Sequence, residues 1–515
     1  MKNIVRSPQR VVCNANQALH GIAATQHIEQ TAAPTLPPHT LMQRAGLAVA
    51  QLACAIAPHA RSVWLVCGPG NNGGDGLEAA MHLQHWGRNP VVTWLGDEAR
   101  YPLEAHHPPD AKSSLLRARA AGVQFASAAP ARFDVAVDAL LGIGGGTRPL
   151  PQAMQIWLLH MHASPAPVLC VDVPSGLNAD TGCYFEPNFA TQLIAARAQP
   201  VMASGIYCLS LLTIKPGLFT AHGRDAAGQV WWDDLAVTHA QAPTAWLLGD
   251  KHANTFNPAN TEQRSHASHK GSYGDVAVIG GATGMTGAAL LAARAALHYG
   301  AGRVFVGLLD SSLTVDPTQP ELMFRAVDTL DIQTSAVVCG CGGGDAVRAV
   351  LPRVLSTAQR LVLDADALNA LATDPSLQTL LKHRAARSLS TVLTPHPLEA
   401  ARLLGCSTQA VQANRLIAAQ QLADQYHCTA VLKGSGTVIA SFGQLACINP
   451  TGNARLATAG TGDVLAGMVG AQLAQGGLAH QAACHAVYQH GLAADRWPSH
   501  LALTADALAR FVHGS

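Results

Sequence analysis

A loop of nine residues, 68–76 (GPGNNGGDG), contains five glycines, two asparagines and one aspartate. Glycine loops that cradle phosphate usually end in a lysine or open directly into a helix, whereas this loop ends in an acid that would repel phosphate. Its amide and carboxylate oxygens are hard donors, which suit an alkali or alkaline-earth cation and not zinc. We therefore expect the loop to approach a ligand through glycine N–H groups while it helps to seat a cation.

Near the other end of the chain, residues 457–476 (ATAGTGDVLAGMVGAQLAQG) join a glycine turn to an apolar helix of small residues. The N-terminus of such a helix offers free backbone N–H groups and a positive dipole end, which together bind anions. Asp463 follows the turn, where it could take a proton from a hydroxyl that attacks phosphorus. Residues 432–437 (LKGSGT) add a lysine and two hydroxyls for a phosphorylated ligand. The alternative is that Gly460 and Gly462 only form a turn and that Asp463 caps the helix.

Short apolar runs alternate with alanine-rich stretches along the chain. A helix is predicted over 76–87. The strand-containing segments are 62–68, 89–96, 133–142 and 166–174, followed by 274–281, 303–310, 335–345, 360–368, 391–396 and 429–441. Strands and helices in alternation favour parallel sheets covered by helices. Ligands of open α/β sheets bind at the carboxyl ends of the strands, where the glycine-rich loops of this chain are expected.

Length and composition restrict the class of protein. A chain of 515 residues should form about two to four domains of roughly 150 residues each. Hydrophobic residues make up 49% and charged residues 13%, and the formal net charge is +1. This composition allows large cores and excludes a disordered chain. No global field draws the protein to nucleic acid or to an anionic membrane.

The twelve cysteines include no CxxC pair, so the spacing typical of zinc sites is absent, as is that of disulfide frameworks. We expect reduced thiols in a cytoplasmic protein. The first residues (MKNIVRSPQRVVCNANQ) contain no apolar stretch of the signal-peptide kind. No run of about 18 or more apolar residues is present to span a membrane.

The GTGD helix start, together with LKGSGT and residues 363–371 (LDADALNAL), resembles the ribokinase-like superfamily. In that superfamily such a helix start forms the anion hole and carries the base. Within it, residues 269–303, 363–371, 394–405 (TPHPLEAARLLG) and 459–467 are similar to the NAD(P)H-hydrate dehydratase family, and the similarity covers about 269–512. The TPHP-E element favours this family over sugar kinases.

The resemblance implies roles for particular residues of the second half. The hydrated nicotinamide would contact Ala288, Gly342, His396 and Asp463. The adenine nucleotide would be held by Lys433, Gly434, Ser435, Gly436, Thr437 and Gly462. Where the family shows Gly-Pro-Gly-Leu-Gly, this chain has Gly340-Cys-Gly-Gly-Gly344, a loop made less rigid by the loss of proline. For His396 the alternative is a structural histidine that packs or caps.

In the first half, residues 41–46 (LMQRAG), 68–76, 138–144 (DALLGIG), 172–182 (DVPSGLNADTG) and 214–218 (IKPGL) resemble the NAD(P)H-hydrate epimerase domain, over about 11–236. The resemblance assigns potassium to Asn72, Asp138 and Ser175. It assigns ligand contacts to Asn71, Asn72, Gly73, Gly74, Asp75, Gly142, Ile143, Gly144, Gly145, Gly146, Thr147, Arg148 and Asp172. The segment 183–206 departs from the family, with Ala203-Ser-Gly205 in place of an alanine-aspartate pair, and no functional residue is assigned there.

Asp172 is the candidate acid and base of the first half. The damaged cofactor carries a hydroxyl on C6, next to the ring nitrogen, so protonation lets the hydroxyl leave with electron push from nitrogen. Water that returns to the other face inverts the centre, and one carboxyl group could serve both steps. The alternative is that Asp172 caps the turn of the following Pro-Ser-Gly.

The expected fold class is α/β with two domains, a Rossmann-like three-layer sandwich over 11–236 and a ribokinase-like domain over 269–512, joined by a linker over 237–268. This fusion is the arrangement of bifunctional NAD(P)H-hydrate repair enzymes. The resemblance implies epimerisation of the R and S hydrates, which needs K⁺. It also implies dehydration of the S hydrate, which needs Mg²⁺ and, in prokaryotic members, ADP.

Three alternatives remain from the sequence. The chain could be a small-molecule kinase with an appended domain, a non-catalytic binding protein, or a dehydratase whose first domain is only structural. The sequence leaves open the oligomeric state, the preference for NADH or NADPH hydrate, and channelling between the two sites.

Overall fold

The computed structural model describes residues 7–96, 108–197, 205–253, 266–310 and 313–512. The chain divides into two compact units, one made of residues 1–12 and 18–245 and the other of residues 13–17 and 246–515. Among the helices of the described ranges, none has both the length and the apolarity needed to cross a membrane.

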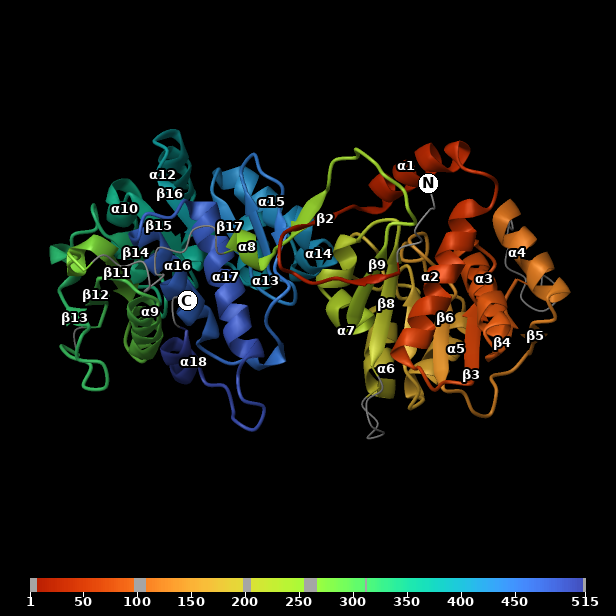
Figure 1. Ribbon diagram of the computed structural model, residues 1–515. Coiled ribbons are helices and arrows are strands. Elements are labelled where there is room, and N and C mark those ends of the chain that lie inside the picture. The colour runs from red at the N-terminus through yellow and green to blue at the C-terminus, as the bar shows by residue number, and fades with distance from the viewer. Residues whose placement is uncertain (1–6, 97–107, 198–204, 254–265, 311–312, 513–515) are drawn as a thin grey trace. The chain divides into compact units, whose positions relative to one another are not determined.

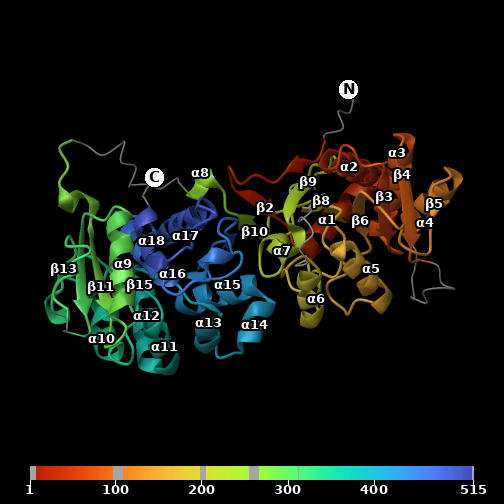
Figure 2. The same cartoon turned by 90° about the horizontal axis from the view of Figure 1, so that it is seen from below.

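The first unit is built on a sheet in the order β1-β9-β8-β7-β6-β3-β4-β5, in which all neighbours are parallel except β1 and β9. Figure 2 shows α2 and α3 on one face of this sheet and α5 and α6 on the other. The strands are β1 (Gln9–Arg10), β3 (Ser62–Cys67), β4 (Asn89–Trp94), β5 (Gln124–Phe125), β6 (Val135–Ala139), β7 (Val168–Val171), β8 (Ile206–Leu211) and β9 (Gln229–Asp233). The helices are α1 (Ile22–Ala32), α2 (Thr40–Ile56), α3 (Asn71–His85), α4 (Pro109–Ala120), α5 (Gln152–Ala163), α6 (Pro187–Arg197) and α7 (Gly223–Ala227).

The sheet of the second unit runs β13-β12-β11-β14-β15-β16-β17-β18-β19-β10 and is parallel from β13 to β17 (Figure 1). β18 is antiparallel to both of its neighbours. The strands are β10 (Ala245–Leu247), β11 (Asp275–Gly280), β12 (Arg303–Leu308), β13 (Met323–Phe324), β14 (Ala336–Cys339), β15 (Arg360–Leu363), β16 (Ser390–Leu393), β17 (Thr429–Leu432), β18 (Val438–Ser441) and β19 (Cys447–Ile448). A short strand nearer the N-terminus, β2, spans Gln17–Leu19.

Helices cover both faces of the second sheet. Successive side chains of a strand point to opposite faces, so the two faces can be told apart by the clusters that their residues join. Val276 and Val278 of β11 belong to one buried cluster, and Ala277 and Ile279 belong to another. The first cluster includes residues of α8 (Asp250–Ala253), α9 (Thr286–His298), α16 (Thr461–Ala474), α17 (Ala479–Asp495) and α18 (Ala505–Phe511). The second includes residues of α10 (Val347–Thr357), α11 (Asp366–Thr373), α12 (Pro375–Ala386), α13 (Pro397–Leu404), α14 (Thr408–Ala413) and α15 (Arg415–Tyr426). The α/β fold class predicted from the alternating pattern is therefore confirmed.

Two features differ from the sequence-based prediction. The loop 68–76 is only partly a loop, because α3 already begins at Asn71. Its glycines are needed for packing: a Cβ added at Gly73 would lie 1.8 Å from the carbonyl oxygen of Gly68. The predicted linker 237–268 contains β10, which pairs with β19, and α8. Residues 254–265 of that segment lie outside the described residues, as do 198–204 of the atypical segment 183–206.

Glycines also let α16 pack deep in the second unit. A Cβ added at Gly467 would lie 2.0 Å from the carbonyl oxygen of Ala292 in α9, and one at Gly470 would lie 2.4 Å from Val338 Cγ2 in β14. The helix is buried along most of its length. Close packing on both sides fixes the position of its first turn, which carries Asp463.

Candidate active sites

A cavity of about 530 Å³ in the first unit is lined by the loops that follow β3, β6 and β7. Most of the ligand contacts predicted for this unit line it. They are Asn71, Asn72, Asp75, Gly142, Ile143, Gly144, Gly145, Arg148 and Asp172. Gly73 and Gly74 instead face protein atoms of the loop and of Met42, and Gly146 faces the backbone at Asn178. Thr147 is not among the residues that line the cavity.

Asn72 lies in the first turn of α3 and is buried. Within the described part of the chain, neither the oxygen nor the nitrogen of its amide has a hydrogen-bond partner. A Cβ added at Gly142 would lie 3.4 Å from Asn72 Oδ1 and 3.0 Å from Asp172 Oδ2, so these groups converge on one point of the cavity wall. A buried amide without partners costs free energy, and a bound ligand would satisfy it.

The other two predicted potassium ligands are joined directly. Ser175 Oγ donates to Asp138 Oδ1 at 2.6 Å, and Ser175 N donates to Asp138 Oδ2 at 2.9 Å. Ser175 Oγ also accepts from Leu141 N at 2.9 Å, one residue before Gly142. Burial raises the pKa of Asp138, although the hydrogen bonds from Ser175 oppose that shift.

Asp172 has a left-handed backbone, with φ of 66°. Such a conformation is strained for a residue other than glycine and clusters at functional sites. Its carboxylate accepts from Ile143 N at 3.2 Å and from Leu211 N at 3.4 Å. It also forms an ion pair with the fully buried ammonium of Lys215. These partners come from two separate segments, the loop after β6 and the end of β8 with the loop that follows it, so the carboxylate is held across the site and does not merely cap the turn of residues 174–176.

Acidic groups crowd the same cavity, where Glu29, Asp75, Asp110 and Asp172 all contribute to the lining. Removal from water raises the pKa of Asp75 well above its ordinary value, and the charge of Asp172 raises it further. Burial raises the pKa of Glu29 in the same way, again with help from Asp172. A bound cation would offset this repulsion.

In the second unit Asp463 is the third residue of α16, whose N-cap is Gly460 with φ of 90°. The N–H groups of Gly462 and Asp463 lie in the first turn, where no preceding helical carbonyl is available to them, whereas Thr461 N donates to Thr458 O at 3.4 Å. A Cβ added at Gly462 would lie 3.3 Å from Lys433 Nζ. An ammonium and a helix N-terminus therefore face the same point, which is an arrangement that binds phosphate.

The N-cap residue of α16 is Gly460, and Asp463 lies inside the first turn. Ligand atoms of Cys341, Asp364 and Asp463 all lie within 4.8 Å of one another. Burial raises the pKa of Asp463 to about 7, and the charge of Asp364 contributes to the shift. A carboxylate with a pKa near 7 is suited to act as a general base at neutral pH.

Asp364 is buried and contacts several other residues of this site. Its Oδ1 accepts from Lys433 Nζ at 2.7 Å and from Thr394 Oγ1 at 2.7 Å. Burial alone would lower the pKa of Lys433, but the charges of Asp364 and Glu399 outweigh it and raise that pKa. Burial raises the pKa of Glu399 to about 7.

The two ring nitrogens of His396 have different surroundings. Its Nδ1 accepts from Leu398 N at 3.1 Å and from Glu399 N at 3.2 Å, so His396 caps α13. In the neutral ring the proton must then lie on Nε2, which is 3.3 Å from Glu399 Oε1. Burial lowers the pKa of His396, which favours this neutral form. The structural alternative considered from the sequence is thus correct for Nδ1, while Nε2 can donate.

The remaining predicted contacts of the second unit fall into two groups. A Cβ added at Gly342 would lie 2.9 Å from Ala288 Cβ, which places these two residues side by side. The loop 340–344 lacks proline but is tied down, since Ala282 N donates to Gly342 O at 2.7 Å and Gly344 N donates to Asp366 Oδ2 at 2.9 Å. The segment from Lys433 to Thr437 is supported by Arg415, whose guanidinium donates to Leu432 O and Lys433 O.

Two family models match separate parts of the chain. The family model described as NAD(P)H-hydrate dehydratase matches residues 276–512, and the model described as YjeF-related protein N-terminus matches residues 38–206. The bifunctional NAD(P)H-hydrate repair enzyme Nnr of Escherichia coli (strain K12) is 36% identical over 480 residues, which cover 89% of this chain and 85% of that protein. The chain belongs to the bifunctional NAD(P)H-hydrate repair enzyme family.

Two further relatives match the second half. The ADP-dependent (S)-NAD(P)H-hydrate dehydratase of Neisseria meningitidis serogroup B (strain ATCC BAA-335 / MC58) is 43% identical over 254 residues, which cover 48% of this chain and 84% of that protein. A crystal structure of the ADP/ATP-dependent NAD(P)H-hydrate dehydratase from Bacillus subtilis, co-crystallised with ATP/Mg²⁺, has 32% identity and a TM-score of 0.42 and covers 48% of this chain and 91% of that chain.

Four residues support the two sites of this repair-enzyme chain but were not predicted from the sequence: Lys215, Asp364, Glu399 and Arg415. The first three lie inside motifs that were already singled out, IKPGL, LDADALNAL and TPHPLEA. The signal was a charged residue in an otherwise apolar motif, since such a charge is rarely buried without a partner. Arg415 lies in no such motif, and only the fold brings it to the segment 432–437.

Replacing Asp463 should stabilise the second unit. The pKa of Asp463 is about 7 in the folded chain. As pH rises from about 4 to 7, this carboxyl group therefore ionises in the unfolded chain while it stays protonated in the folded chain. Stability is lost over that window, so Asp463→Asn should gain about 1 to 4 kcal/mol at pH 8, and the gain should shrink toward pH 4. Calorimetric unfolding of the full chain measures this. The exposed Asp328→Asn is the matched control. An unchanged midpoint for Asp463→Asn at pH 8 would contradict the raised pKa of Asp463.

Proposed function

We propose that the chain repairs hydrated NADH and NADPH, with epimerisation in residues 11–236 and ADP-dependent dehydration of the S hydrate in residues 269–512. The observation that carries the proposal is that each half holds a catalytic carboxylate next to the groups that its reaction needs. Asp172 is held by Lys215 beside the buried amide of Asn72. Asp463 has a pKa of about 7 and lies at a helix N-terminus that faces Lys433.

In the epimerase site, Asp172 protonates the C6 hydroxyl, which leaves as water while the ring nitrogen supplies electrons. Water then adds to C6 from the opposite face, and the carboxylate of Asp172 takes back the proton. The ammonium of Lys215 stabilises the carboxylate between the two steps. The N–H groups of Gly142 and Gly144 and those of the first turn of α3 are available to the pyrophosphate.

Potassium fits the donor set of the epimerase site. The partnerless amide of Asn72 and the oxygens of Asp138 and Ser175 are hard donors from the ends of three strands. The cation would supply the positive charge that the acidic lining lacks. Asn72, Asp138 and Ser175 would hold it.

In the dehydratase site, Asp463 takes the proton of the C6 hydroxyl as its oxygen attacks the terminal phosphorus of ADP, and AMP leaves. The phosphorylated C6 then loses inorganic phosphate while C5 gives a proton to water, which restores the ring double bond. Lys433 and the N–H groups of the first turn of α16 stabilise the charge on the transferring group.

ADP and magnesium fit the second site. The segment from Lys433 to Thr437 and Gly462 surrounds the point where the ammonium of Lys433 and the helix N-terminus meet. Magnesium would neutralise phosphate charge there, and the carboxylate of Asp364 is a hard oxygen donor that would help to hold it.

Variants of the two carboxylates should separate the two activities. With a mixture of R and S hydrates and ADP, Asp172→Asn should restore dihydronicotinamide absorbance only from the S fraction. Asp463→Asn should restore none, while it still interconverts R and S by chromatographic assay. Each lost step should slow by about 10²- to 10⁴-fold, the usual contribution of a general acid or base.

The exposed Asp225→Asn and Asp328→Asn serve as controls in the two units and should behave like the wild type. The assay must run faster than uncatalysed epimerisation. If Asp172→Asn still recovers the R fraction, the first unit is not an epimerase that uses Asp172. If the wild type accumulates a stable phosphorylated product, the small-molecule kinase is the correct alternative.

Epimerisation should depend on the alkali cation. We expect a higher rate of R/S interconversion in KCl than in LiCl at equal ionic strength, because the smaller ion does not span the donors of a site that K⁺ fits. Asn72→Ala should abolish most of this difference. Dehydration of the S hydrate by the same protein is the internal control, and equal epimerisation rates in both salts would contradict a potassium site.

A further inference from the structure

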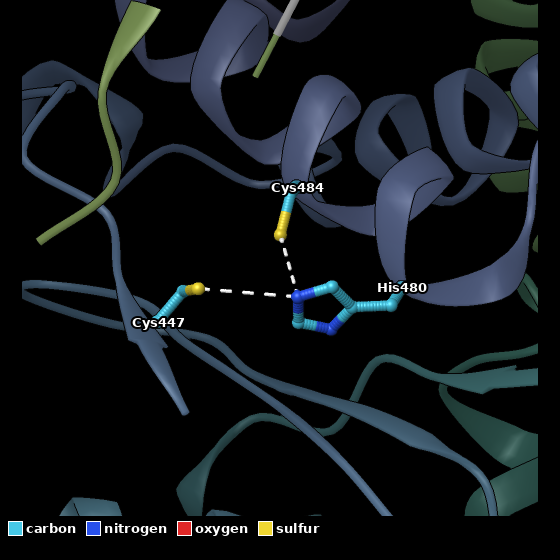
Figure 3. A group of neighbouring side chains, drawn as sticks. All are labelled: Cys447, His480 and Cys484. Carbon is cyan, nitrogen blue, oxygen red and sulfur yellow. Dashed lines mark hydrogen bonds between the residues drawn. The ribbon is translucent and has the colours of Figure 1, made fainter. Parts of the chain in front are cut away.

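Three side chains that play no part in the proposed reactions meet in the second unit (Figure 3). Cys447 comes from β19, and His480 and Cys484 come from α17. His480 and Cys484 are four residues apart, so they lie on the same face of the helix. His480 Nε2 is 3.5 Å from Cys484 Sγ and 3.9 Å from Cys447 Sγ, as the dashed lines in the figure mark. All three ligand atoms lie within 4.8 Å of one another.

These separations match the edges of a metal-centred tetrahedron. With Zn–S of about 2.3 Å and Zn–N of about 2.1 Å, a tetrahedral angle places sulfur and nitrogen about 3.6 Å apart. The two observed sulfur-to-nitrogen distances, 3.5 and 3.9 Å, lie on either side of that value. Both sulfur-to-nitrogen distances are therefore compatible with a zinc ion held by the three side chains.

The imidazole of His480 is also oriented as in metal sites. Its Nδ1 is 2.9 Å from Ser441 Oγ, which in turn is 2.8 Å from Thr429 Oγ1. When Nδ1 carries the proton and donates to Ser441, the lone pair of Nε2 points to the two sulfurs. Histidine ligands of metals almost always have such an outer partner, which fixes the tautomer and the plane of the ring.

The fourth coordination position would open toward a groove. Cys447 and His480 line a groove of about 1010 Å³, and His252 lines it as well. This volume is ample for a water molecule. Cys447 and Cys484 are themselves buried, which protects their sulfurs from solvent.

We propose that Cys447, His480 and Cys484 form a site for a thiophilic divalent cation, with Zn²⁺ as the preferred ion and water or His252 as its fourth ligand. Two sulfurs and one imidazole select zinc over magnesium or calcium. The site shares no residue with the dehydratase site. Because its ligands come from β19 and α17, the ion would join a strand of the sheet to a helix, and binding would displace the thiol protons.

The test is cobalt binding to the metal-free full-length chain, followed by absorbance. The wild type should bind one Co²⁺ per chain with a sulfur-to-cobalt charge-transfer band and the d–d bands of a tetrahedral site, and Zn²⁺ should bleach both. Cys484→Ser and His480→Gln should weaken binding by more than the roughly 10- to 100-fold that loss of an outer partner costs. The exposed Cys406→Ser is the matched control and should bind like the wild type.

Thermal unfolding guards against misfolded variants. Zn²⁺ should raise the midpoint of the wild type and of Cys406→Ser, but not that of His480→Gln, which keeps both thiols. Absence of the charge-transfer band in the wild type would overturn the proposal. So would equal cobalt affinity of Cys484→Ser and the wild type, or a Cys447–Cys484 disulfide in the metal-free chain that forms in place of metal binding.

Discussion

Repulsion between carboxylates at the carboxyl ends of parallel strands is the constraint on which both sites depend. Parallel strands direct the loops that follow them to one edge of the sheet, so acids from separate loops meet there with little water. In the first unit they are Asp75 and Asp172, which lie near Glu29 of α1, and in the second they are Asp364, Glu399 and Asp463. One lysine in each unit pairs with a single acid, Lys215 with Asp172 and Lys433 with Asp364. The unpaired acids keep raised pKa values, so each site favours the arrival of cations, and the acids of the second unit can exchange protons near neutral pH.

Helix starts provide the complementary positive ends. Glycines at the beginning of α3 and within α16 let both helices approach the rest of the unit more closely than any other residue would permit. Their first turns therefore present N–H groups to the same region as the carboxylates. A dinucleotide or a nucleotide with its cation suits such a mixed site better than a bare anion does, because the cation meets the acids and the phosphates meet the N–H groups. This accounts for a glycine-rich segment that ends in an acid.

Sequence patterns predicted the features that lie within short motifs and missed the contacts that the fold makes between distant residues. Asp172, Asp463 and the glycine segments stand in short motifs, and the α/β alternation was visible in runs of apolar residues. The start of α3 at Asn71 was missed because three glycines in its first two turns suggest a loop, whereas tertiary packing stabilises the helix. The pairing of Lys433 with Asp364 joins residues 69 positions apart. The cluster of Cys447, His480 and Cys484 was not predicted because it combines a strand with one turn of a helix, and no CxxC spacing indicates it.

The titration of Asp463 tests the central claim most directly. Carbon-13 NMR of the aspartate carboxyl groups in the ligand-free full-length chain, with Asp463→Asn used to assign the resonance, gives its pKa in place. The account predicts a midpoint of about 7, because burial and the charge of Asp364 both oppose ionisation. A midpoint near 4, the ordinary value for aspartate, would show that the site is well hydrated. It would contradict the view that crowded, poorly solvated carboxylates prepare this enzyme for its chemistry.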